Sequence, residues 1–442
     1  MRQLHAGAAR SVITPTIGGW QHGNVHDDLY SKALVLASGD ATIAFAVCDL
    51  PVIAKRDADR AKEIAEKLTG IPATNIMVAA THTHYAPFDA SDAPHYQAYF
   101  EWVAGRVADS IMMAKRQLRP ALISYGSGMV PGEVFHRRYW MKDGTVLMNP
   151  VGSEYRDPAT GEVRQHTKEE IVRPAGTVDP EVGALFLLDE ARHPIAVLAN
   201  YALHYVNAPD YSEISANYFG AFERALQRMS QSNLVGIMLN GCCGDVNNED
   251  HLGEQDPYPY DYYRVDRVAD VVACEVYQLW RSVRYSRWTG DVGISAASEA
   301  WEYRTGSVTP EEVAEAEAFL KDRKPPGWGK VDWLDWVKAW RSLRLSKMGS
   351  SQISQVQAFR IGDLAIAALP TEVFVEIGLD IKRRSPFKQT IVGELANDWF
   401  GYLPTDAGFE QGGYETLASR CAPGTGQSLA DCAVRLLRKV AS

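Results

Sequence analysis

The segment Asn75-Ile76-Met77-Val78-Ala79-Ala80, followed directly by Thr81-His82-Thr83-His84, places two histidines at the end of a short apolar run. A proline lies on each side of the segment, and the run is too short for a helix, so it predicts a buried core strand. Side chains alternate between the faces of a strand, so His82 and His84 should project in the same direction. Two imidazoles so arranged fit a metal ligand and an acid or base in one pocket, although an ordinary pair of surface or core histidines fits the motif equally well.

Strand-like and helix-like patterns intermix along the 442-residue chain. Strands are predicted at 9–14, 31–37, 41–50, 75–80, 121–129, 194–203, 233–240, 355–361, 363–369 and 389–395, with a hairpin at 139–149. Helices are predicted at 58–68, 93–118, 216–230, 262–283, 310–321, 331–347, 372–382 and 429–440. The class is therefore α/β (α+β), with mixed β-sheets at the core covered by helices. A doubly wound nucleotide-binding fold is not expected, because no glycine fingerprint follows the first strand.

Domain organisation is predicted to be simple. Length alone would suggest about three domains. However, the chain has no Pro/Ser/Gly-rich linker, no block of like charges and no internal repeat, so a single domain over 1–442 is expected.

The segment 305–349 stands apart as a helical, charged insertion that carries Trp328, Trp333, Trp336 and Trp340. The spacing puts the last three tryptophans on one helical face. That face either packs on the domain or serves as a mobile cover, a lid, that presents aromatic surface to a substrate.

The acidic balance of the chain excludes some classes of partner. The net charge of −10 and a pI near 5.6 argue against nucleic acid or an anionic membrane as the main partner. No apolar run approaches membrane-spanning length, and the first residues show no signal-peptide pattern. The six cysteines form no CxxC pair and predict reduced, mostly buried thiols, so a cytoplasmic location is expected. The oligomeric state, including a homo-oligomer, is left open.

Polar residues recur where apolar strands are predicted to end. His204 follows one such run, Asp245 and Asn247 follow a second, and Glu372 follows a third. Each alone has a simple structural explanation: His204 as a satisfied core histidine, Glu372 as an acid favoured at a helix N-terminus. Their repetition at several strand ends indicates an active site, because there the scaffold is rigid while side chains remain free.

Six motifs together are typical of one known family. They are Ala6-Gly7-Ala8-Ala9-Arg10-Ser11-Val12-Ile13-Thr14-Pro15, Ala80-Thr81-His82-Thr83-His84, Asn200-Tyr201-Ala202-Leu203-His204, Gly244-Asp245-Val246, Leu369-Pro370-Thr371-Glu372-Val373-Phe374 and the tyrosine pair Tyr402 and Tyr414. Through them the chain resembles the catalytic domain of the neutral (non-lysosomal) ceramidases and their shorter bacterial relatives. The resemblance extends to about residue 427, so the C-terminal immunoglobulin-like domain of that family is expected to be missing.

The resemblance implies a single Zn²⁺ held by four side chains, those of His82, His204, Glu372 and Tyr402. Two neutral imidazoles, a carboxylate and a phenolate are borderline-to-hard ligands that suit this ion. Zinc can lower the pKa of a bound water to about 7 and polarise a carbonyl oxygen. The implied chemistry is hydrolysis by metal-activated water.

Three further residues receive catalytic roles through the same resemblance. His84 would take or deliver a proton, and Tyr414 would donate a hydrogen bond to the developing oxyanion. Arg137 resembles the arginine that braces the site, and Arg138 fits the short local match equally well. Without the family, surface or packing roles would be the simpler explanation for Tyr414 and Arg137.

The sequence departs from the family at Asn247, which stands where the ceramidases carry a serine assigned as a nucleophile. An asparagine side chain cannot be a nucleophile of that type, so a serine-based acyl-enzyme is excluded. Asp245 and Asn247 are instead candidate contacts to hydroxyls of a small polar or sugar-like substrate. Asn217 is a third candidate, with a helix N-cap role equally consistent.

The expected function is therefore a zinc-dependent hydrolase that cleaves an amide (N-acyl) bond of a small polar or amphiphilic substrate. Within enzymes, the alternative is an ester, lactone or glycosidic bond cleaved on the same zinc platform, since fold resemblance does not fix the substrate. From another class, the alternative is a zinc-stabilised binding protein without catalysis. The presence of His84 and Tyr414 beside the expected ligands favours the enzyme.

Overall fold

An eight-stranded mixed sheet forms the largest layer of the computed structural model, which describes residues 3–15, 24–88, 94–206, 213–253 and 260–442. Its spatial order is β16-β14-β13-β6-β1-β3-β4-β5. Most neighbours are antiparallel, whereas β4–β5 and β14–β16 are parallel. The bounds are β1 (Leu4–Val12), β3 (Tyr30–Ser38), β4 (Ala41–Cys48), β5 (Ile76–Ala80), β6 (Arg119–Met129), β13 (Glu181–Asp189), β14 (Pro194–Tyr201) and β16 (Val235–Asn240).

A four-stranded sheet packs on one face of the large sheet. It consists of β18 (Ile294–Arg304), β19 (Ser351–Ile361), β20 (Leu364–Ala368) and β22 (Gln389–Gly393), in that order. Side chains of β19 alternate: Phe359 and Ile361 join the core between the two sheets, whereas Val356 and Ala358 face the other way. This alternation follows from the period of two along a strand and buries both faces of the small sheet.

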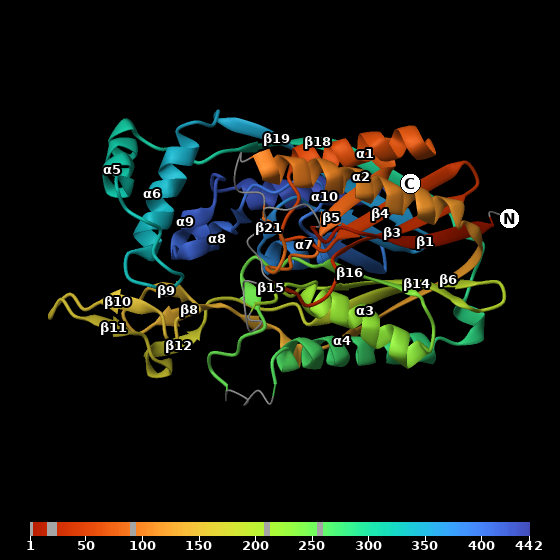
Figure 1. Ribbon diagram of the computed structural model, residues 1–442, viewed down its shortest axis with the longest axis horizontal. Coiled ribbons are helices and arrows are strands. Elements are labelled where there is room, and N and C mark those ends of the chain that lie inside the picture. The colour runs from red at the N-terminus through yellow and green to blue at the C-terminus, as the bar shows by residue number, and fades with distance from the viewer. Residues whose placement is uncertain (1–2, 16–23, 89–93, 207–212, 254–259) are drawn as a thin grey trace.

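Helices cover the outer faces of both sheets, giving four layers (Figure 1). On the large sheet, α1 (Lys55–Thr69) and α2 (Pro94–Arg116) cover one half, and α3 (Asn217–Ser230) and α4 (Tyr263–Ser282) cover the other. The small sheet is covered by α7 (Val375–Arg384) and α10 (Thr425–Ala441). No helix among the described residues is long and apolar enough to span a membrane.

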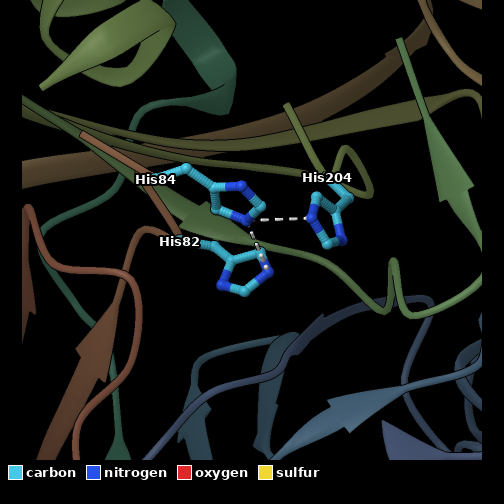
Figure 2. A group of neighbouring side chains, drawn as sticks. All are labelled: His82, His84 and His204. Atoms are coloured by element: carbon cyan, nitrogen blue, oxygen red, sulfur yellow. Dashed lines mark hydrogen bonds between the residues drawn. The ribbon is translucent and has the colours of Figure 1, made fainter. Parts of the chain in front are cut away.

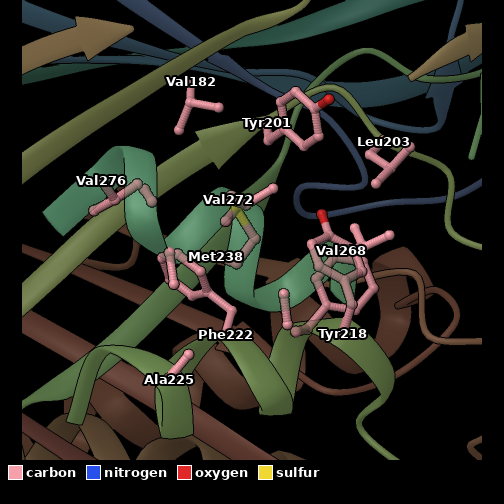
Figure 3. Packing of buried hydrophobic residues seen from close by; sticks show 14 of the residues in the cluster. Val182, Tyr201, Leu203, Tyr218, Phe222, Ala225, Met238, Val268, Val272 and Val276 are labelled. Atoms are coloured by element: carbon pink, nitrogen blue, oxygen red, sulfur yellow. The ribbon is translucent and has the colours of Figure 1, made fainter. Parts of the chain in front are cut away.

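The core under α3 and α4 shows how these helices are held (Figure 3). Phe222 from α3 and Val272 from α4 pack with Met238 of β16, and all three side chains are buried. Burial of one such side chain contributes about 1.5–3 kcal/mol. The apolar residues of α3 and α4 recur at helical spacing, so the sequence alone sets which face packs on the sheet.

A smaller lobe lies at the end of the molecule away from both termini (Figure 1). It contains the two helices of the insertion, α5 (Pro310–Leu320) and α6 (Trp333–Leu345), of which α5 begins at a Thr309–Glu312 capping box. Its strands are β8 (Arg138–Met141), β9 (Val146–Met148), β10 (Glu154–Arg156), β11 (Val163–Gln165) and β12 (Ile171–Pro174), and beside them lie α8 (Asp406–Gln411) and α9 (Tyr414–Ala418).

Short strand pairs complete the described structure, namely β2 (Asn24–Val25) with β15 (Glu213–Ile214), β7 (Phe135–His136) with β17 (Val246–Asn247), and β21 (Glu372–Val373) with β23 (Tyr402–Leu403). The predicted fold class is confirmed, as are most predicted elements. Two long strands, β13 and β18, escaped prediction.

The helix predicted at 372–382 is present, but it begins later than predicted. Glu372 lies in β21, in parallel register with Tyr402, and α7 begins only at Val375 after Phe374. The residue before Glu372, Thr371, has a φ of +66°, which is incompatible with a right-handed helix. The explanation of Glu372 as a helix N-terminal acid is therefore wrong.

Candidate functional site

The site lies where strands of the two sheets end side by side. Ala80, the last residue of β5, donates its backbone N–H to Leu395 O at 3.1 Å, and Leu395 N donates to Thr371 O at 3.2 Å. Glu394 N donates to Asn240 O, at the end of β16, at 3.0 Å. These hydrogen bonds tie loops from both sheets into one rigid edge, from which the functional side chains project.

Three imidazoles meet at this edge (Figure 2). His84 Nε2 lies 3.0 Å from His204 Nε2 and 3.5 Å from His82 Nε2, and one ring nitrogen from each lies within 4.8 Å of the others. His82 and His84 thus reach the same place, as predicted, but not by strand alternation. Both follow the end of β5, and His82 has a φ of +75°, a conformation that costs a non-glycine residue about 1–3 kcal/mol.

Glu372 brings a carboxylate to the imidazoles. Its Oε1 accepts a hydrogen bond from Trp399 Nε1 at 2.8 Å, whereas its buried Oε2 has no hydrogen-bond partner. Oε2 lies 3.3 Å from His82 Nε2 and 4.0 Å from His204 Nδ1. Burial would raise the pKa of Glu372, but His82, the Trp399 hydrogen bond and Arg137 outweigh burial and lower it to about 2.

Glu372 Oε2 and His82 Nε2 are both acceptors, so a cation fits between them. His82 Nδ1 lies 2.6 Å from Pro51 O, so Nδ1 donates to that carbonyl and Nε2 of the neutral ring presents a lone pair. A buried anionic oxygen without a donor, next to imidazole lone pairs, is the donor set that divalent zinc takes in proteins.

Arg137 connects the imidazoles to a buried carboxylate. Its guanidinium donates to His204 Nδ1 at 2.8 Å, to Glu415 Oε1 at 2.8 Å and to Gly244 O at 2.7 Å. Arg138 turns instead towards Glu415 Oε2, 3.2 Å away. Of the two arginines that the sequence left open, Arg137 is the one that faces the site.

The donors of Arg137 also locate the ring proton of His204. A guanidinium has no acceptor, so His204 Nδ1 must accept, and the proton of a neutral ring lies on Nε2, facing His84 Nε2. A cation could be bound through Nε2 only if this proton left that nitrogen, because a metal ligand needs a free lone pair.

Burial keeps the imidazoles of His84 and His204 neutral. It lowers the pKa of His84 to about 3, with smaller contributions in the same direction from His82 and Arg137. Burial, followed by the same kind of neighbours, also lowers the pKa of His204 well below its usual value. Neutral imidazoles have a free lone pair, which both a metal ligand and a proton acceptor require.

Tyr402 and Tyr414 stand beside the cluster with their ring centroids 5.4 Å apart. The Arg137 guanidinium lies 5.1 Å from the centre of the Tyr402 ring. Burial, followed by the charge of Glu372, raises the pKa of both phenols above the usual value of tyrosine. Both are therefore hydrogen-bond donors in these surroundings, and only a nearby cation would make Tyr402 a phenolate.

Of the three predicted substrate contacts, Asp245 and Asn247 have side-chain partners within the protein, whereas Asn217 accepts from Tyr218 N and its buried Nδ2 has no hydrogen-bond partner. Asp245 accepts a hydrogen bond from Val375 N at 2.8 Å, and Asn247 donates to Asn149 Oδ1 at 3.0 Å. Asn217 follows the N-cap of α3, which is Ala216, so it is not itself the N-cap. Among the described residues, the side chains that line the cavity beside the site include none of these three predicted contacts.

That cavity has a volume of about 900 Å³. Its lining includes the predicted residues His84, Arg137, His204, Tyr402 and Tyr414, and also Asn149, Tyr155, His166, Glu249, His251, Trp328 and Trp333. No motif or spacing in the sequence pointed to Asn149 or His251. Trp399 and Glu415, which hold Glu372 and Arg137, adjoin the tyrosine motif and were detectable only as its neighbours.

Comparison with known proteins identifies the fold. No protein-family model matches the sequence, and no curated protein matches it. Among solved structures, the neutral ceramidase from Pseudomonas aeruginosa matches with a TM-score of 0.70 and 17% identity, over 100% of this chain and 75% of that one. A ceramidase complexed with C2 matches with a TM-score of 0.71 and 14% identity, over 99% and 75%. The chain has the neutral ceramidase fold, which confirms the resemblance at the level of architecture.

Proposed function

We propose that this chain, with its neutral ceramidase fold, is a zinc-dependent hydrolase that cleaves an amide (N-acyl) bond of a small polar or amphiphilic substrate. The observation that supports it most is Glu372 Oε2, a buried anionic oxygen that has no hydrogen-bond donor and lies 3.3 Å from a histidine lone pair. Asp49 Oδ1 and Glu415 Oε2 are also buried without a hydrogen-bond donor, but those two carboxylates pair with Lys32 and Arg138, whereas Glu372 Oε2 faces imidazoles.

The proposed ligands are His82, His204, Glu372 and Tyr402. The first three converge in space, and Tyr402 pairs in register with Glu372 through β21 and β23. A divalent cation held there would polarise a carbonyl oxygen and acidify water. The proton-transfer and oxyanion-stabilising roles are proposed for side chains of the protein.

His84 is proposed to accept a proton from the attacking water and pass it to the leaving nitrogen. Its ring lines the cavity and lies 3.0 Å from His204 Nε2. Burial lowers its pKa and keeps the ring neutral with a lone pair, and the charge of Glu372 favours the protonated form that the ring would pass through.

Tyr414 is proposed to donate a hydrogen bond from its phenol to the substrate carbonyl oxygen, which gains negative charge during the reaction. It lines the cavity, and burial keeps it protonated. Arg137 is proposed as a positioning residue, because it contacts His204, Glu415 and Gly244 O rather than open space. Asn247 occupies the family's serine position with its amide bonded to Asn149, so water is the nucleophile in this proposal.

The test is metal analysis of the purified protein followed by a panel of N-acyl, ester and glycoside substrates, each with and without chelator. We expect about one zinc per chain and chelator-sensitive release of the acyl group from the amides. Turnover of esters or glycosides alone would support the proposed metal site and show that the bond cleaved is not an amide. Bound metal with no turnover on any class would favour a binding protein instead.

A further inference from the structure

A continuous row of four aromatic rings leads from the imidazoles to the surface. Tyr402 contacts Tyr414, which contacts Trp333 at 4.7 Å and Trp328 at 5.0 Å between ring centroids. Trp328 and Trp333 lie 4.2 Å apart, and Trp328 is 56% exposed. All four side chains line the cavity described above. We call these four residues the aromatic wall.

The wall is assembled from segments far apart in sequence and is fixed at its outer end. Glu154 N, in β10, donates to Gly329 O at 2.7 Å, and Lys330 Nζ pairs with Glu154 Oε1 at 2.7 Å. These two contacts join the β10–β11 hairpin to the insertion beside Trp328. The tryptophans are thereby held against Tyr414 without any bound molecule.

Polar groups share the cavity with the aromatic wall. Asn149, Glu249 and His251 all line it. His251 Nε2 is buried and makes no hydrogen bond, and lies 3.6 Å from Glu249 Oε2. His166, also in the lining, has a buried Nδ1 without a hydrogen bond, 3.3 Å from Glu170 Oε2. Buried polar atoms of this kind are costly unless a ligand satisfies them.

We infer that the cavity binds a polyhydroxylated ring of the pyranose type, stacked on Trp333 and Trp328, next to the bond that is cleaved. An aromatic face carries negative charge density, and the C–H face of a sugar ring carries the complementary partial positive charge. Ring hydroxyls can satisfy the imidazole and amide groups of the lining. A long alkyl chain could contact the aromatic wall and the apolar lining residues Leu147, Met148, Val151 and Leu334, but it would leave the polar groups of the lining unpaired.

This inference rests on the proposed function only in taking the same cavity as the substrate site, and binding can be measured without turnover. The probes are the three N-acetylated hexosamines with gluco, galacto and manno configuration. N-acetylethanolamine supplies the same amide without a ring, and N-octanoylethanolamine supplies an alkyl chain. Ligand-observed saturation-transfer NMR reports which protons touch the protein, and titration gives each dissociation constant.

We expect at least one hexosamine to bind roughly tenfold more tightly than either ethanolamide, with the strongest saturation on ring C–H protons. Trp333→Ala should remove that advantage, and Trp328→Ala, at an exposed position, should weaken it without disturbing the fold. Trp336→Ala is the matched control, because Trp336 lies on the same helix and stacks on Trp340 rather than lining the cavity.

Equal affinity for ring and ring-free amides, a preference for the octanoyl chain, or a hexosamine advantage that survives both cavity variants would each overturn the inference. If the hexosamines bind through the wall but no substrate of any class is hydrolysed, the inference stands and the proposed hydrolase activity fails. If only N-octanoylethanolamine is hydrolysed and no hexosamine binds, the proposed hydrolase activity stands and the inference fails.

Discussion

Two buried polar clusters in this protein are built in opposite ways. In the first, Lys32 Nζ lies 3.3 Å from Glu223 Oε2 and 3.8 Å from Asp49 Oδ2, and Arg10 lies 3.2 Å from Glu223 Oε1. Each charged group there lies near an opposite charge, although Asp49 Oδ1 has no hydrogen-bond donor and burial raises the pKa of Asp49 to about 6. In the second, Glu372 Oε2 faces the lone pair of His82 Nε2, so acceptor meets acceptor.

The difference shows which cluster serves the fold and which serves a ligand. Burial would lower the pKa of Lys32, but Asp49 and Glu223 outweigh it and raise that pKa, so the charged form is matched by the protein itself. In the imidazole cluster the charged form of Glu372 is also favoured, but its Oε2 has no hydrogen-bond donor and the cluster opens onto a cavity through His84 and His204. We therefore expect the first cluster to govern stability and the second to govern metal binding and rate.

The largest expected effect is the loss of metal from the second cluster. His82→Ala or His204→Ala should reduce bound zinc from about one per chain to nearly none and lower the hydrolysis rate roughly 1,000-fold. Metal content by mass spectrometry and initial rates check this. His193→Ala is the control, because His193 is an exposed histidine beyond the end of β13. Zinc retained in both cluster variants would show that the ligand assignment is wrong.

In the first cluster, Lys32→Met should lower the free energy of unfolding by about 3 kcal/mol, because it leaves Asp49 and part of Glu223 buried without a counter-charge. The rate per folded molecule should not change. Denaturant unfolding measures the first quantity and active-fraction kinetics the second. Lys55→Met, at a half-exposed i,i+4 pair with Asp59, should change stability by less than about 0.5 kcal/mol. A similar loss in both variants would contradict the comparison.

The variant His84→Ala tests whether His84 in the second cluster is a proton acceptor or a metal ligand. We expect the metal content to stay the same and the rate to fall about 100-fold, since positioned acid–base groups contribute at least that much. If zinc leaves with the His84 ring, the centre is a three-imidazole site and His84 is a ligand. The distances of 3.0 and 3.5 Å to the other rings make this the decisive variant.

The smallest expected effect is on the stability of the metal-free protein. Glu372→Gln retains an acceptor for Trp399 Nε1 and removes an anion without a donor, so the free energy of unfolding should change by less than about 1 kcal/mol. Added zinc should stabilise the wild-type protein and not the variant, because a ligand stabilises only the state that binds it. Destabilisation comparable to that of Lys32→Met would mean that Glu372 supports the fold.

The sequence by itself determined the elements and the edge at which the site forms. Short apolar runs and helical periodicity are local properties, so β5, β14, β20 and the helices that cover them could be predicted from spacing alone. The same runs marked where His84, His204 and Glu372 follow a strand. The strands β13 and β18 escaped prediction although their side chains alternate in the structure.

Only the tertiary structure decided how these residues meet. Strand pairing between segments hundreds of residues apart brings the ends of β5, β14 and β20 together. The distance between these ends cannot be predicted from the spacing of residues along the chain. The left-handed backbone at His82 and Thr371 is imposed by packing rather than by residue type. The same packing places Trp328 and Trp333 against Tyr414 and turns Arg137, not Arg138, towards His204, because each contact depends on the relative position of separate layers.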